Sequence, residues 1–131
     1  MLPKDIKLHR RSGILELLYS DTSFKLSAEF LRVHSPSAEV RGHAPGQEVL
    51  QFGKSKVLIS NIEPVGNYAL RLVFDDGHDS GLYTWSYFRE LGENQSTMWQ
   101  QYLEKLKAAG KSREALLAGT QAINIQALKS D

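Results

Sequence analysis

The chain has 131 residues, of which 41% are hydrophobic and 24% are charged, and its formal net charge is +1. This length and composition are typical of one globular domain, and a charge so near zero disfavours nucleic-acid binding, which needs clustered basic residues facing phosphates. The chain contains no cysteine, which excludes disulfides, thiolate nucleophiles and metal sites built from cysteine.

The N-terminal part of the chain predicts strands followed by one short helix. Residues 4–19 predict two strands joined by a turn, because apolar and polar residues alternate on both sides of a serine and a glycine. The stretch SDTSF at residues 20–24 predicts a break. Residues 25–34 predict a helix with Ser27 as its N-cap. Pro36 ends this helix, because the residue before a proline is disfavoured in the helical conformation.

The middle of the chain predicts a loop and then a run of strands. Residues 35–47, SPSAEVRGHAPGQ, are rich in serine, proline and glycine and predict a surface loop. Strands are predicted at residues 48–52, 56–65 and 68–74, where hydrophobic residues recur at strand spacing. The DDG sequence at residues 75–77 predicts a hairpin turn, because Asp-Gly tolerates the positive φ that tight hairpins require.

The C-terminal part of the chain predicts a return strand and two helices. The return strand covers residues 78–85, and residues 84–91 form a short helix ended by Gly92. The strongest helical pattern spans residues 96–109, with large apolar residues at helical spacing, and Gly110 ends it.

These elements predict one α+β domain, in which an antiparallel β-sheet carries short helices and a C-terminal amphipathic helix packed on it. The domain is expected to cover residues 1–110, followed by a tail of residues 111–131. In the tail, residues 112–119 favour two more helical turns, and residues 120–131 are expected to be either a strand or mobile. No apolar run is long enough to cross a membrane and no signal peptide is visible, so we expect a cytoplasmic protein that does not bind membranes.

The sequence carries no motif of a known catalytic site. It lacks G-x-S-x-G, and Ser80, Asp79 and His78 are neighbours on a predicted strand, where successive side chains point to opposite faces. Asp75 and Asp76 beside His78 offer oxygen ligands to a hard cation, but aspartate is also favoured in turns for its local hydrogen bonds. The sequence therefore favours a non-catalytic domain over a small enzyme built on this hairpin.

Two segments resemble a known family, namely FLRVHSPSAEV and YALRLVFDDGHDSGLYTWSYFREL. Across roughly residues 4–91 the chain resembles the gamma-butyrobetaine hydroxylase-like N-terminal domain. In this family, the domain stands at the front of certain iron- and 2-oxoglutarate-dependent hydroxylases. Members also occur alone in bacteria, without a known function, and fused to iron–sulfur scaffold ATPases in plastids.

In the hydroxylases, the resemblance implies a zinc site formed by a C-P-C-x-x-C loop and a histidine from the later hairpin. On this chain the three cysteine positions fall on Ser35, Ser37 and Val40, and the histidine falls on His78. Neutral serine hydroxyls are poor zinc ligands and valine has no donor atom, so we expect the family's zinc site to be lost. The facial triad of the oxygenases is also missing, because the chain has no H-x-D pair.

Two interpretations of this loss stay open. In the first, the loop packs without a metal, and His78 forms an ordinary hydrogen bond with a loop carbonyl or a serine hydroxyl. In the second, His34, His43 and His78 converge, with Glu39 or an aspartate, and bind zinc or iron. The first interpretation is favoured because it needs no new ligand set.

The favoured function is a non-catalytic interaction domain without a cofactor, which binds a partner protein or a second copy of itself. The alternative, implied by the family's fusions, is a metal-handling accessory of iron–sulfur cluster assembly. Aromatic residues of the stretch 83–88 are expected to extend the binding surface, with Trp85 and Phe88 in the core. The predicted binding residues are His34, Ser35, Ser37, His43, Asp76, His78 and Ser80.

Overall fold

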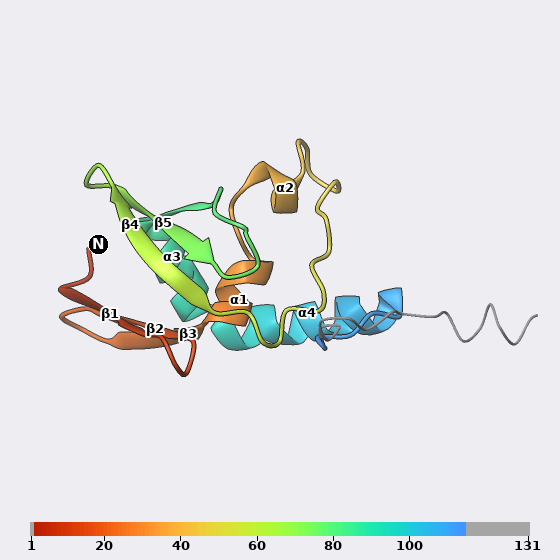
Figure 1. Cartoon of the computed structure of the whole chain (residues 1–131), viewed down its shortest axis with the longest axis horizontal. Helices are drawn as coiled ribbons and strands as arrows, with labels where there is room; N and C mark the ends of the chain where they lie inside the picture. The colour runs from red at the N-terminus through yellow and green to blue at the C-terminus, as the bar shows by residue number, and fades with distance from the viewer. Residues whose placement is uncertain (1, 115–131) are drawn as a thin grey trace, which may run out of the picture.

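The computed structural model describes residues 2–114, in which two three-stranded antiparallel sheets are combined with helices (Figure 1). The first sheet has the order β1-β2-β3 and the second β4-β5-β6. The α+β class is therefore confirmed, but the one predicted sheet is two sheets. The strands are β1 (Asp5–His9), β2 (Ile14–Leu18), β3 (Ser23–Ser27), β4 (Ile59–Val65), β5 (Ala69–Phe74) and β6 (Leu82–Thr84).

The helices begin and end where local capping chemistry allows. In α1, the Ser27 hydroxyl accepts a hydrogen bond from the Phe30 N–H at 3.0 Å, as expected of an N-cap. In α4, Gly110 adopts the left-handed conformation with φ +67° and ends the helix as predicted. The helices are α1 (Ala28–Val33), α2 (Ala38–Arg41), α3 (Trp85–Glu93) and α4 (Gln95–Ala109).

The prediction that Gly92 ends a helix is wrong, because α3 continues to Glu93. The reason for a glycine at this position is packing against the first sheet. A methyl group added to Gly92 would lie 2.5 Å from the ring of Phe24 on β3. The glycine thus allows the helix backbone to approach an aromatic ring closely.

Three predictions of strand extent are also wrong. The predicted break at residues 20–24 overlaps β3, because pairing with β2 outweighs the local turn preference. Residues 48–52 form no strand. The return strand is shorter than predicted and begins only at Leu82, because residues 78–81 leave the sheet and pack against the connection between α1 and α2.

The core lies between the two sheets and the helices that cover them. Phe88 is 0% exposed, as predicted, but Tyr83 is also 0% exposed and so belongs to the core and not to the predicted aromatic surface. Tyr87 is half-buried. The Tyr83 hydroxyl donates to the Leu31 carbonyl at 2.5 Å, which satisfies its polar end. The amphipathic helix α4 packs with Tyr102 and Leu106 on Val33 of α1.

The residues that follow α4 pack back onto the body of the domain. The Gly53 N–H donates to the Ser112 carbonyl at 2.9 Å, and the Arg113 guanidinium forms a two-point ion pair with Glu29 at 2.7 and 2.8 Å. The predictions for residues 115–131 lie outside the described residues, and the boundary at residue 110 stays a prediction. Within residues 2–114, no helix has both the length and the apolar character needed to cross a bilayer.

Candidate functional site

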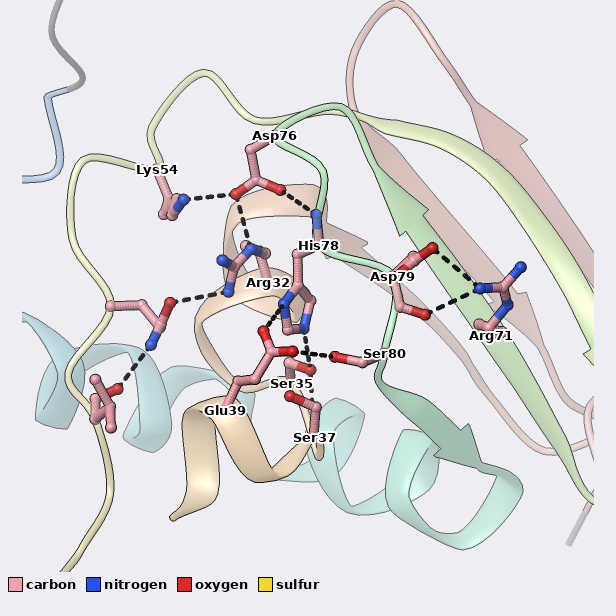
Figure 2. Close-up of polar contacts among 12 residues, drawn as sticks. Arg32, Ser35, Ser37, Glu39, Lys54, Arg71, Asp76, His78, Asp79 and Ser80 are labelled. Carbon is pink, nitrogen blue, oxygen red and sulfur yellow. Dashed lines mark hydrogen bonds and ion pairs between the residues drawn. The ribbon is translucent and has the colours of Figure 1, made fainter.

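A polar cluster forms where the hairpin after β5 meets the connection between α1 and α2 (Figure 2). The hairpin contributes Asp76, His78 and Ser80, and the connection and α2 contribute Ser35 and Glu39. The direct contact joins residues 43 positions apart in the chain. The cluster thus brings together five polar residues from the two segments that the resemblance singled out.

His78 lies at the centre of this cluster and is 6% exposed. Its Nε2 lies 2.8 Å from the Ser35 hydroxyl, and its Nδ1 lies 3.4 Å from a carboxylate oxygen of Glu39. Because a carboxylate only accepts, Nδ1 carries the proton and the neutral ring accepts from Ser35 at Nε2. Burial, and next the positive charge of Arg32, lower the pKa of His78 and so favour this neutral ring.

Ser35 is closed off from solvent, although the Ser–His–Glu order is that of a nucleophilic triad. Ser35 is 1% exposed, and its hydroxyl also accepts the Ser37 N–H at 3.3 Å. A methyl group added at Gly81 would lie 2.4 Å from the Ser35 oxygen. A nucleophile needs room for a substrate carbonyl. The three side chains Ser35, His78 and Glu39 therefore form a structural hydrogen-bond chain.

A second group of charges anchors the tip of the same hairpin. One carboxylate oxygen of Asp76 accepts from Arg32 at 2.9 Å and from Lys54 at 2.5 Å, and the other accepts the His78 N–H at 3.1 Å. Burial alone would raise the pKa of Asp76, but these donors hold it at about 2. Arg32 also donates to the side chain of Gln51 at 3.0 Å, which ties the cluster to residues 48–51.

A groove of about 340 Å³ opens beside this cluster, between α4, the end of α1 and residues 48–51. Its lining includes the buried residues Val33, Val40 and Tyr102. Arg41 and Lys105 also line it, are exposed, and form no ion pair within residues 2–114. The Arg41 guanidinium lies over the Tyr87 ring, 4.7 Å from its centre. The groove therefore combines apolar walls with positive charge that no ion pair within residues 2–114 neutralises.

The chain matches the family described as gamma-butyrobetaine hydroxylase-like, N-terminal, over residues 6–89. It belongs to the gamma-butyrobetaine hydroxylase-like N-terminal domain family. No curated protein matches the chain.

Solved structures support the same assignment. One protein, known from an NMR solution structure, is 50% identical with a TM-score of 0.78 over 94% of this chain and 98% of that chain. A second NMR solution structure is 48% identical with a TM-score of 0.74 over 94% of this chain and 91% of that chain. A protein of unknown function of the DUF971 family from Acidithiobacillus ferrooxidans, in a crystal structure, is 34% identical with a TM-score of 0.57, over 69% of this chain and 91% of that chain.

The zinc site implied for hydroxylases of this family does not fit the residues of this member. Ser35 and His78, at two of the four ligand positions, are hydrogen-bonded directly to each other. The alternative histidine site is not assembled either. His34 bonds the Phe30 carbonyl through Nδ1 at 2.8 Å, and His43 is exposed in the loop after α2. No three histidine, aspartate or glutamate side chains within residues 2–114 are grouped to hold a metal ion.

The predicted binding residues thus separate into two sets. His34 and Ser35 line the groove, whereas Ser37, Asp76 and Ser80 do not. His78 bridges Ser35 and Glu39 within the cluster, and His43 lies apart in an exposed loop.

Sequence reasoning missed two residues, one that connects the cluster to residues 48–51 and one that lines the groove. Arg32 is 7% exposed and contacts both Asp76 and Gln51, yet nothing in the sequence distinguishes it from a solvent-facing helix residue. Lys105 carried a signal of its own, because it lies on the polar side of the predicted amphipathic helix.

Proposed function

We propose that this family member is a non-catalytic interaction domain that binds a partner protein at the groove between α1, α4 and residues 48–51. One contrast carries the proposal. Ser35 and His78 are buried and bonded to each other, whereas Arg41 and Lys105 beside the groove are exposed and form no ion pair within the described part of the chain.

The chemistry of the groove suits a protein partner. Its apolar walls continue onto Val49 and Phe52, which are 53% and 49% exposed. Protein interfaces commonly combine an apolar centre with a polar or charged rim. Large side chains that stay exposed beside a groove gain most by burial against another chain.

Affinity purification from an extract of the source organism tests this function. The bait proteins are the parent chain, the groove variant Phe52→Ser/Lys105→Glu, and the control Lys7→Glu, whose exposed residue lies on β1. We expect a protein that the parent and the control retain and the groove variant loses, and that binds the purified parent in a titration. Retention of every captured protein by the groove variant would contradict the proposal. Covalent labelling of Ser35 by a fluorophosphonate would contradict its non-catalytic part.

A further inference from the structure

The main chain beside the groove alternates between bonded and unbonded residues. The Val49 N–H donates to the Val40 carbonyl at 2.8 Å, and the Gly53 N–H donates to the Ser112 carbonyl at 2.9 Å. Between them, the Gln51 carbonyl accepts from the Tyr102 hydroxyl on α4 at 2.9 Å. Every second residue from 49 to 53 is therefore bonded to its own chain.

The intervening residues use none of their main-chain groups. The N–H and C=O groups of Leu50 and Phe52 form no hydrogen bond within residues 2–114. In a β-strand, alternate residues direct these groups to the same edge. The segment thus has one edge held by its own domain and one edge without a partner among residues 2–114.

The sequence of residues 48–52, EVLQF, predicts a strand, yet no strand within residues 2–114 pairs with it. An unpaired edge of this kind is a template for the addition of an extended segment from another chain. We propose that residues 49–52 accept an extended acidic segment of a partner protein as an added strand. This inference rests on the proposed interaction function and specifies the partner's chemistry.

The positive charges around residues 49–52 are the reason that we propose an acidic strand. Arg41 and Lys105 line the groove, and the Lys111 ammonium lies 4.8 Å from the centre of the Phe52 ring. None of these three cations forms an ion pair within the described residues. Glu48 is the one acidic residue in the groove lining, and its carboxylate already accepts the Gly46 N–H at 3.2 Å. Complementary charge therefore favours carboxylates on the partner.

The same charges disfavour a second copy of this chain as the occupant. A two-fold contact places the same patch of both copies against each other. Pairing of residues 49–52 with their own symmetry mate would bring both sets of cations around one axis. An acidic segment of a different protein avoids this repulsion.

Selection from a phage library of random short peptides on the immobilised chain tests the inference. We expect selected sequences in which aspartate or glutamate alternates with apolar residues. A synthetic peptide of the selected sequence should bind Lys105→Glu about tenfold more weakly than the parent. It should bind the control Lys7→Glu as tightly as the parent, since Lys7 lies on β1, in the sheet at the other end of the molecule from the C-terminal half of α4 (Figure 1).

A scan of backbone N-methylation along that peptide tests strand pairing. Methylation at alternate residues should weaken binding at least about tenfold, and methylation at the intervening residues should have little effect, because only alternate N–H groups face the pairing edge. Uniform tolerance of methylation would overturn strand addition.

Other results would overturn the identity of the occupant. A library that yields no binder, or binders without acidic residues, contradicts the acidic strand, while groove-dependent capture of a protein would leave the proposed function standing. A dimer in sedimentation that Lys105→Glu abolishes would assign the edge to a second copy of this chain.

Discussion

The cluster around His78 and the segment at residues 49–52 are joined by Arg32, which donates to Asp76 in the first and to Gln51 in the second. In the cluster, the buried ring of His78 finds a partner at each nitrogen, namely the buried Ser35 hydroxyl and the exposed Glu39 carboxylate. In the segment, the main-chain groups of Leu50 and Phe52 form no hydrogen bond within residues 2–114, and the neighbouring cations form no ion pair there. Polar groups that are satisfied internally hold a fold together, and those that are not are available for recognition.

The same comparison shows which contacts hold the hairpin after β5 against the connection between α1 and α2. Where the resemblance implies a metal site that ties a hairpin to a loop in the hydroxylases, this chain has the Ser35–His78 hydrogen bond and the ion pairs of Asp76. Four variants test this division, because they should affect stability in the cluster and leave it unchanged at the groove.

The largest effect is expected from Gly81→Ala in the cluster. The added methyl group would lie 2.4 Å from the Ser35 oxygen and 3.2 Å from Pro36, so the hairpin must move. We expect a loss of about 2–3 kcal/mol in the free energy of unfolding, measured by urea denaturation. The same change in a Ser35→Ala background should cost less, because the closest contact is gone. Equal costs in both backgrounds would show that the contact does not matter.

A smaller loss is expected from Ser35→Ala alone. It leaves the buried Nε2 of His78 without its hydroxyl partner, which should cost about 1–2 kcal/mol in the free energy of unfolding. Ser80→Ala is the matched control, because its exposed hydroxyl bonds Glu39 at 3.3 Å at the solvent-facing side. A cost for Ser80→Ala as large as that for Ser35→Ala would remove the distinction between buried and exposed serines.

Acid should weaken the anchor at Asp76. Its pKa is about 2 in the folded chain against an ordinary value of 3.8, so its stabilising contribution is complete above pH 4 and is lost as the pH falls towards 2. Allowing for partial solvent screening, about 1–2 kcal/mol of unfolding free energy should disappear in this window. Denaturation curves of Asp76→Asn should lack that part of the pH dependence, and an unchanged slope would contradict the role of the carboxylate.

The smallest effect on stability is expected at the groove. Lys105 is exposed and forms no ion pair within the described residues, so Lys105→Glu should change the free energy of unfolding by less than about 0.5 kcal/mol. Thermal denaturation measures this directly. A large loss would mean that the cation supports the fold and would weaken its assignment to binding.

Local chemistry was sufficient to predict several parts of the fold from sequence. The cap at Ser27 and the end of α4 at Gly110 depend on neighbouring residues alone, and both are confirmed. The division into two sheets and the strand at β3 depend on pairing between segments, which alternation of residue types does not specify.

The candidate site shows the same limit. The position of His78 beside Ser35 could be anticipated from the family resemblance, because both residues fall on positions that the resemblance implies as zinc ligands in the hydroxylases. The partners of Asp76 could not, since Arg32 and Lys54 lie 44 and 22 residues away and carry no motif. Residues 48–52 have the composition of a strand, but only the structure shows that the described part of the chain places no strand beside them.

The ion pair between Arg113 and Glu29 has a consequence for where the domain can be cut. Glu29 is 6% exposed and lies in α1, while Arg113 follows the last helix. A protein shortened to residue 110 would leave this buried carboxylate without its guanidinium and would remove the carbonyls that accept the N–H groups of Gly53 and Ser55. We therefore expect a protein that ends at residue 110 to be less stable than one that extends to residue 113.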